Sequence, residues 1–308
     1  MKKSVFMIAL AFGVSSAFAQ DLTSKKGEPI LPEAGDWAIS MDASPIFQYV
    51  GNAFNGNTAN AAPGANWLNG NQTIIGKKFI DEKSAYRVLV RLGFTSQSYK
   101  NNVNDDANTT APVFPATAPE VTDKFSMKNT NIGIGVGKEF RRGKTRLQGY
   151  YGADAMIWIS MSSNKFTYGN TMSSTNAAGV TTTPTSTTWN TSTGAVLGEG
   201  AVGSRSLKTT SGMTFGIGVR GFIGAEYFIF PKISVGAEYG WGIGYQMTGK
   251  GKSETETTGG TPLTVGVVEG ETAGSSKFGF DTDLNQGTIF GFRGSNTGTA
   301  SLRATFHF

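Results

Sequence analysis

The sequence predicts an all-β protein: an eight-stranded, antiparallel, up-and-down transmembrane β-barrel. Apolar and polar residues alternate strictly over runs about twice as long as an ordinary strand of five or six residues. Glycine is abundant, with 42 among 308 residues, whereas charged residues make up only 16%. After residue 20 no apolar run is long enough for a membrane helix, so alternating strands are the expected way to face lipid.

The N-terminus has the pattern of a cleaved secretory signal peptide over residues 1–19. Lys2-Lys3 is followed by an apolar centre and by the small-residue site Ala17-Phe18-Ala19. Residues 20–34 are a polar lead, expected to be periplasmic and loosely held, and residues 35–308 are expected to form the barrel. With no cysteine, neither disulfides nor thiolate chemistry is expected. The formal charge is +5, of which Lys2 and Lys3 contribute two, and the rest of the sequence contains no basic block. No nucleic-acid partner is therefore expected.

The clearest strands form a hairpin within Leu207–Lys250. Apolar residues occupy alternate positions on both sides of a corner at Pro231, while glycines, Arg220, Glu226 and Glu238 occupy the others. One further strand is expected to begin at Trp37, and others are expected within 72–80, 86–95, 132–140, 146–159 and 301–308. The phase of 72–80 stays open, because Ile74 and Ile75 indicate opposite phases.

The expected connections alternate between long and short. Long ones cover 51–70, 100–124, 162–206 and 249–295, and short turns lie at 81–84, at 141–144 and at Pro231. The short turns fall on the side of both termini, which is the pattern of bacterial outer-membrane barrels with periplasmic turns and extracellular loops. Ten strands are the alternative, if Lys277–Gly294 forms its own hairpin.

Together with the terminal segment Leu302–Phe308, these features resemble the small outer-membrane β-barrels of Gram-negative bacteria, the OmpA-barrel and OmpW-like group. The resemblance implies location in the cell outer membrane and contact with outer-membrane lipid and lipopolysaccharide. It also implies that the barrel-assembly machinery reads the C-terminal strand through Phe308. No peptidoglycan-binding domain follows the predicted barrel, so a tether to the cell wall is not expected.

Ionisable residues in the expected strands lie almost entirely in the polar register. Five arginines and five carboxylates share it: Asp42, Arg87, Arg91, Glu139, Arg146, Asp154, Arg220, Glu226, Glu238 and Arg303. Lys138 is the exception. A barrel of eight strands is just wide enough for side chains to fill, and arginine bonds carboxylates bidentately. The sequence therefore predicts a lumen closed by an arginine–carboxylate network without lysine. The alternative is a narrow, charge-lined, OmpW-like channel for small solutes.

The glycines allow two interpretations, a nucleotide-binding motif or space for packing inside the barrel. Gly216–Gly221 matches the G-x-G-x-x-G nucleotide fingerprint, but the alternation continues through it, whereas the fingerprint needs a strand-to-helix turn. Glycines on the inner face are instead expected to make room for arginine side chains from neighbouring strands.

Neither an enzymatic activity nor a cofactor or metal site is expected. His307 is the only histidine, and nothing in the sequence places a serine and a carboxylate beside it. Asp281–Gly287 resembles the start of a calcium loop but departs from the full pattern. The expected role is structural or surface-interactive, through long extracellular loops whose ligand the sequence does not identify.

Overall fold

The computed structural model describes residues 22–56, 73–108, 112–173, 184–281 and 300–308. These residues form an all-β protein with one large antiparallel sheet, a two-stranded sheet and one helix. The large sheet contains β1 (Trp37–Asp42), β2 (Ile74–Asp81), β3 (Ser84–Asn104), β4 (Glu120–Arg142), β5 (Leu147–Thr167), β8 (Ser204–Thr210), β9 (Thr214–Phe230), β10 (Ile233–Thr248), β11 (Gly251–Gly259), β12 (Thr264–Thr272), β13 (Ser275–Asp281) and β14 (Ala300–His307). The small sheet contains β6 (Thr185–Trp189) and β7 (Val196–Ala201), and the helix is α2 (Ser44–Phe54).

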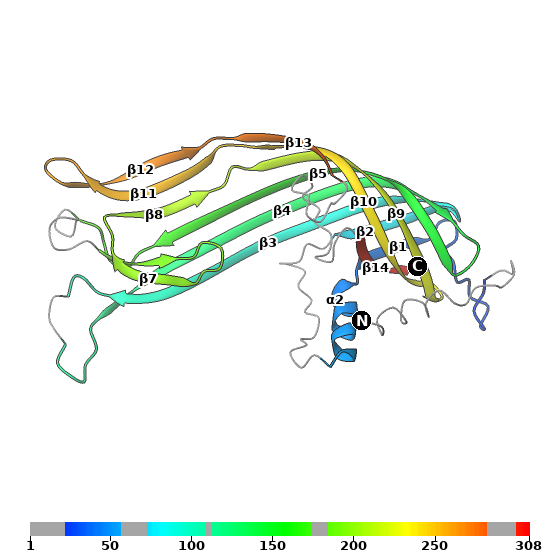
Figure 1. The fold of residues 1–308 in the computed structure, drawn as a ribbon, viewed down its shortest axis with the longest axis horizontal. Helices are drawn as coiled ribbons and strands as arrows, with labels where there is room; N and C mark the ends of the chain where they lie inside the picture. Colours follow the sequence, from blue (N-terminus) through cyan, green and yellow to red (C-terminus); the bar gives the residue numbers. More distant parts are fainter. Residues whose placement is uncertain (1–21, 57–72, 109–111, 174–183, 282–299) are drawn as a thin grey trace.

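Part of the large sheet rings around until its pairing returns to the first strand. From β1 the antiparallel pairing passes through β2, β3, β4, β5, β9, β10 and β14, and β14 pairs with β1 again. Figure 1 shows this ring at the end of the molecule that carries the C-terminus. Its short turns lie at that same end, where the His307 amide donates to the carbonyl of Lys232 in the β9–β10 turn.

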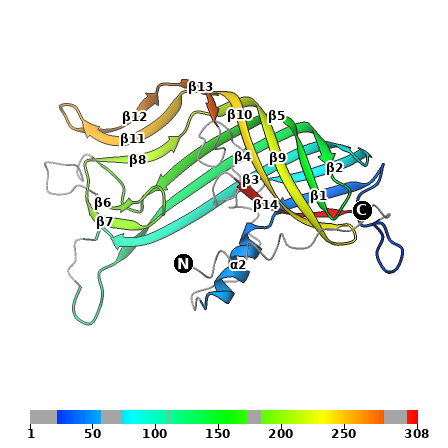
Figure 2. The same cartoon turned by 45° about the vertical axis from the view of Figure 1, so that its right-hand side comes forward.

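The other part of the large sheet is an extension of the ring beyond its closed section. β8 lies on the edge of β5 beyond β9, β11 pairs with β8, and β12 pairs with β11. β13 and β14 pair with the same edge of β10: β14 with its first half, in the ring, and β13 with its second half. Figures 1 and 2 show these strands and the far parts of β3, β4 and β5 reaching well past the ring. We call this region the extension.

Two expected long connections therefore contain strands. The expectation that 162–206 is mostly unstructured is wrong, since β5 continues to Thr167 and β6, β7 and the start of β8 follow. The expected connection 249–295 holds β11, β12 and β13, and the expected loop 100–124 is shortened from both ends by β3 and β4. The strands inside these connections are rich in Ser and Thr and lack the apolar alternation that marks a half-buried strand, which is why the sequence did not reveal them.

The β6–β7 hairpin packs on the extension through aromatic side chains and one buried carboxylate. Trp189 of β6 joins Phe125 and Phe166 in a buried cluster, with Phe125 and Phe166 stacked at 4.8 Å. The Asp123 carboxylate is fully buried and accepts hydrogen bonds from the amides of Gly169 (2.8 Å) and Thr187 (2.7 Å). These contacts hold the hairpin against β4 and β5.

Helix α2 is the one helix among the described residues, and the sequence did not predict it. The alternation of the first strand stops at Asp42, and Pro45 lies in the first turn of α2. Proline is tolerated there because the first amides of a helix have no intrahelical acceptor. The residues that follow were expected to be a loop from residue 51 onward, yet the helix continues to Phe54.

The structure also bears on the phase of β2, on the N-terminal lead and on the alternative hairpin. The phase of β2 is settled, because Ile75, Lys77 and Phe79 are buried while Ile74 and Ile80 are exposed. The lead is not loosely held throughout: Ile30 is buried, and its carbonyl accepts a hydrogen bond from the Lys232 amide. Of the alternative hairpin 277–294, residues 277–281 belong to β13 and the rest lies outside the described residues. Residues 1–19 of the expected signal peptide also lie outside them.

Candidate functional site

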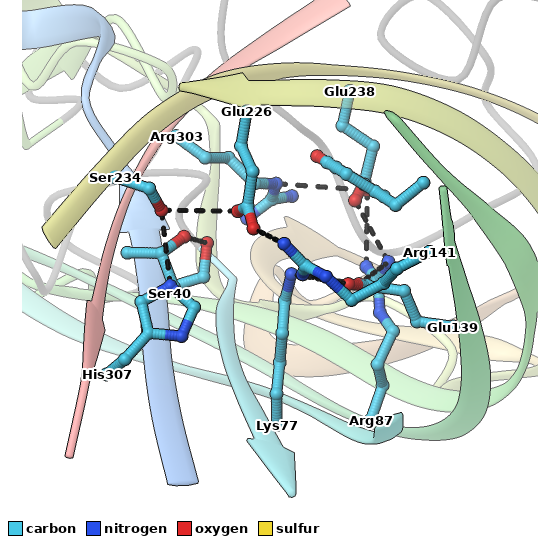
Figure 3. Close-up of polar contacts among 12 residues, drawn as sticks. Ser40, Lys77, Arg87, Glu139, Arg141, Glu226, Ser234, Glu238, Arg303 and His307 are labelled. Carbon is cyan, nitrogen blue, oxygen red and sulfur yellow. Dashed lines mark hydrogen bonds and ion pairs between the residues drawn. The ribbon is translucent and has the colours of Figure 1, made fainter. Parts of the chain in front are cut away.

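The candidate site is a connected set of ion pairs inside the ring. It contains five cationic and four carboxylate side chains, which come from β2, β3, β4, β5, β9, β10 and β14: Lys77, Arg87, Arg141, Arg220, Arg303, Glu139, Asp154, Glu226 and Glu238. Figure 3 shows most of them converging from opposite walls. We call these nine residues the ion-pair network.

Arg87 is the centre of the ion-pair network because it crosses the ring. Its strand β3 lies four pairings from β10 in either direction, yet the guanidinium reaches Glu238 of β10 at 3.0 Å. It also lies 3.3 Å from Glu139 and 3.5 Å from Asp154, and it stacks over the Phe222 ring at 3.7 Å. Arg87 is only 1% exposed. A cation held by three carboxylates and an aromatic face occupies the middle of the interior.

Glu139 joins the rest of the ion-pair network from the side of β2 and β4. Lys77 and Arg141 both lie 2.8 Å from its carboxylate, and Arg141 continues to Glu226 of β9. On the other side Arg220 bridges Asp154 (3.0 Å) and Glu238 (2.5 Å). A buried charge is costly unless it is paired, and here each carboxylate has at least one cation beside it.

Seven of the ten predicted residues belong to this network. Asp42 lies opposite Arg303 in the β1–β14 register, and Arg91 is buried two inward positions beyond Arg87 on β3. Arg146 does not join the network: its guanidinium donates to the carbonyl oxygens of Phe228 (3.2 Å) and Ile229 (3.0 Å) near the β9–β10 turn. Its backbone still continues the pairing with β9, since the Phe228 amide donates to the Arg146 carbonyl, but its side chain bonds the turn instead.

The sequence analysis missed two cations of the network. Arg141 was assigned to a tight turn, but β4 continues to Arg142, which keeps Arg141 in the inward register of Glu139. Lys77 was not predicted because the phase of 72–80 was left open, so the direction of its side chain was not assigned. Its pairing with Glu139 contradicts the expected absence of lysine from the network. Extending the alternation of β4 by one residue pair would have found Arg141.

Apolar layers lie on both sides of the ion-pair network. Toward the extension, Ile75, Leu89, Met156 and Trp158 form a buried cluster. Toward the short turns, the rings of Phe79 and Phe228 lie 5.5 and 5.1 Å from His307. These layers shield the charges from water, which strengthens their mutual attraction.

Inner glycines leave space for side chains of neighbouring strands, but the side chains nearest to the three glycines named here are a carboxylate and two aromatic rings, not the arginines that the sequence analysis expected. A Cβ atom on Gly137 would lie 2.1 Å from the Asp154 carboxylate, and one on Gly224 would lie 2.4 Å from the Tyr150 ring. A Cβ atom on Gly216 would lie 2.1 Å from the indole of Trp158. Gly216–Gly221, the fingerprint-like run, lies entirely within β9.

The structure places a serine beside the single histidine, contrary to the expectation. Ser234 Oγ lies 3.2 Å from His307 Nε2 and 3.2 Å from a carboxylate oxygen of Glu226 (Figure 3). In a catalytic triad the histidine stands between serine and carboxylate, whereas here the serine stands in the middle. Among the described residues His307 Nδ1 has no hydrogen-bond partner, and both side chains are buried.

Two further searches cover only the described part of the chain. It contains no group of three or more His, Cys, Asp and Glu side chains arranged to hold a metal ion. Within the same residues no helix has the length and apolar character to cross a membrane. Residues 282–287 of the calcium-like motif lie outside the description.

Comparison with known proteins gave no match to a family model, a curated protein or a solved structure. The resemblance to small outer-membrane barrels stays a prediction that depends on the pattern of the sequence.

Proposed function

We propose that this chain is an outer-membrane protein whose ring is an eight-stranded transmembrane β-barrel. In this proposal the ion-pair network closes the lumen, and the extension stands outside the cell in a structural or surface-interaction role. The observation that carries the proposal is the opposite placement of charged and apolar side chains on the two faces of one wall. Arg87 is 1% and Glu139 0% exposed, whereas Leu92 and Ile157 are 57% and 51% exposed.

Lipid outside the ring explains this inversion. A wall that is surrounded by water would gain from burying its large apolar side chains, but here they point outward over most of the ring strands. An arginine on the lipid face at mid-membrane costs about 2–4 kcal/mol, which favours an inward position for each one. Six aromatic side chains that would form the two interfacial girdles of a membrane barrel are all exposed: Trp37, Tyr86 and Phe306 near the short turns, and Phe94, Phe215 and Tyr245 toward the extension.

The long strands of the ring are long enough to cross a bilayer. β9 and β10 have 17 and 16 residues, more than the about 9–11 that a tilted membrane strand needs. β1, β2 and β14, with 6, 8 and 8 residues, are shorter than that span. The longest strands, with 21 to 23 residues, continue into the extension.

A closed lumen favours a surface role over transport. Arg87 bridges opposite walls, and the layer of Leu89, Met156 and Trp158 lies between it and the extension. A solute that passed through would have to separate buried ion pairs from each other, which costs several kcal/mol per pair. The extension carries exposed charged side chains such as Lys250 and Glu271, which a ligand outside the cell would meet.

Two measurements test the proposal. Because the chain has no cysteine, single cysteines can be labelled on intact cells with a membrane-impermeant maleimide. We expect labelling at Val267→Cys in the extension and none at Lys83→Cys in the β2–β3 turn until the cells are opened. Labelling of both on intact cells, or of Lys83→Cys alone, contradicts the topology.

Single-channel recording separates the closed lumen from the narrow channel. In planar bilayers the purified chain is expected to give no stable conductance steps. Regular steps above those of lipid alone would overturn the closed lumen and favour the channel for small solutes.

A further inference from the structure

Helix α2 is amphipathic, and its apolar face is exposed. Ile46, Val50 and Phe54 recur every four residues, and Phe47 lies beside them on the same face. Their exposed fractions are 54%, 42%, 79% and 43%. Asn52 lies on the opposite face, which is polar.

The sequence around α2 carries no charge. Between Asp42 and Lys77 there is no aspartate, glutamate, lysine, arginine or histidine. Other exposed parts of the chain do carry charged residues. In the extension, for example, Lys250 and Glu271 pair on the surface. An exposed helix in water is normally covered by charged residues on its outer side, so α2 is suited to a different environment.

The position of α2 is fixed by the ring. It follows β1 directly, at the end of β1 away from the short turns, and the Ala43 amide donates to the Leu302 carbonyl of β14 at 2.9 Å. Figures 1 and 2 show α2 projecting away from the ring on the side of the short strands β1, β2 and β14. The outer face of β1, the strand that leads into α2, exposes the apolar side chains of Ile39 and Trp37.

We propose that the apolar face of α2 lies in the membrane interface, against the lipid acyl chains of the outer leaflet, as an anchor beside the ring. This inference rests on the proposed function, because it needs the outer face of the ring to be in lipid. A helix satisfies its own backbone hydrogen bonds, which an irregular loop in hydrocarbon would leave unpaired. Eleven residues give a length of about 16 Å, too short for a core of about 30 Å, so α2 lies along the interface.

Acyl chains fit this surface better than a protein partner does. α2 follows β1 directly, and β1 exposes apolar side chains on the outer face that the proposed function places in lipid. Because neither face of α2 carries a charge, no ion pair is available to orient a specific protein partner. A second copy of the chain is the outcome against which the experiment is designed.

The test uses quenching of a fluorescent bimane label by brominated lipids. Single cysteines replace Phe54 on the apolar face of α2, Asn52 on its opposite face and Ile157 on the outer face of β5. Each labelled full-length chain is reconstituted in vesicles of ordinary and of acyl-chain-brominated phosphatidylcholine, and iodide serves as the water-soluble quencher. Phe54 and Ile157 are both highly exposed, so these changes leave the packing of the ring intact.

We expect brominated lipid to reduce the fluorescence at Phe54→Cys to an extent comparable with Ile157→Cys. At Asn52→Cys the brominated lipid is expected to act less, and iodide more. Quenching at Ile157→Cys without quenching at Phe54→Cys overturns the α2 anchor and leaves the proposed function standing. Absence of lipid quenching at both positions overturns the proposed function, and the anchor with it. Protection of Phe54→Cys from both quenchers means that protein covers α2, as in a contact between copies, and also overturns the anchor.

Discussion

The ring and the extension use the same strands in two different ways. Along β5, Ile157 and Ile159 point outward from the ring and Asp154 points into the ion-pair network. A few residues further, Lys165 of the same strand is exposed in the extension. Ion pairs differ in the same way: Arg87 and Glu139 are fully buried, whereas the side chains of Lys208 and Glu254 in the extension are 48% and 41% exposed. Under the proposed function, the surroundings of the wall change from lipid to water between these two regions.

The difference predicts where a charge matters most. Removing one partner of a buried ion pair leaves the other charge uncompensated, whereas an exposed pair is screened by water. We expect Glu139→Gln to lower the free energy of unfolding by about 3–5 kcal/mol, because Lys77, Arg87 and Arg141 lose their shared carboxylate. Urea unfolding in lipid or detergent, followed by tryptophan fluorescence, measures this loss.

The matched control is Glu254→Gln in the extension, whose pair with Lys208 spans 3.6 Å. It is expected to cost no more than about 1 kcal/mol. If the two substitutions cost the same, the ion-pair network has no special weight in the ring and the comparison fails.

A change in packing is also expected to destabilise the ring more than the extension, although by less than the loss of a buried carboxylate. Gly216→Ala directs a methyl group to a point 2.1 Å from the Trp158 indole inside the ring. Overpacking of this kind costs about 1–3 kcal/mol. Combining it with Trp158→Phe, which removes the clashing part of the indole, is expected to restore part of the loss in the same unfolding measurement.

Gly266→Ala in β12 is the control, because a Cβ atom there meets nothing within 4 Å. It should leave the unfolding curve unchanged or raise stability slightly. An equal loss at Gly216 and Gly266 would mean that the interior of the ring is not packed around its glycines.

The smallest expected effect is a pH response of the extension. Burial raises the pKa of the Tyr168 phenol from 10.0 to about 12, and its hydroxyl donates to the Ser206 carbonyl at 2.8 Å. The folded state therefore prefers the neutral phenol, and its contribution to stability is complete below pH 10 and lost as the pH rises toward 12. Ultraviolet titration at the tyrosinate band, compared between the chain and Tyr168→Phe, measures this pKa. A Tyr168 phenol that titrates near 10 would show that the side chain is open to water.

The ring was largely predictable from the sequence, and the extension was not. In the ring, alternation of apolar and charged residues marks the two faces of β3, β4, β5, β9 and β10, because the two faces meet different surroundings. In β11, with the sequence Gly251–Gly259, both faces are polar, and the pattern is that of a loop. The pairing of β11 with β8 and β12 depends on partners distant in the chain, which local alternation does not reveal.

The ion-pair network was predictable where the register was clear and not at the ends of the strands. Arg87, Glu139, Asp154 and Glu238 lie within long alternating strands, and their inward direction follows from period two alone. Arg146, just before β5, bonds the carbonyl oxygens of Phe228 and Ile229, so the polar register alone does not bring a side chain into the network. Which carboxylate pairs with which cation follows from the closure of the ring, since Arg87 reaches a strand on the opposite wall.

The most direct test of the central claim is a scan of spin-labelled cysteines through residues 155–159 of β5 in lipid vesicles. Collision rates with oxygen, which dissolves in lipid, are compared with those of a water-soluble nickel complex, and Lys165→Cys in the extension is the reference for water. The account predicts frequent oxygen collisions and few nickel collisions at Ala155, Ile157 and Ile159, with both rates low at Met156 and Trp158. Nickel collisions at the three outward positions that are as frequent as at Lys165→Cys would contradict it.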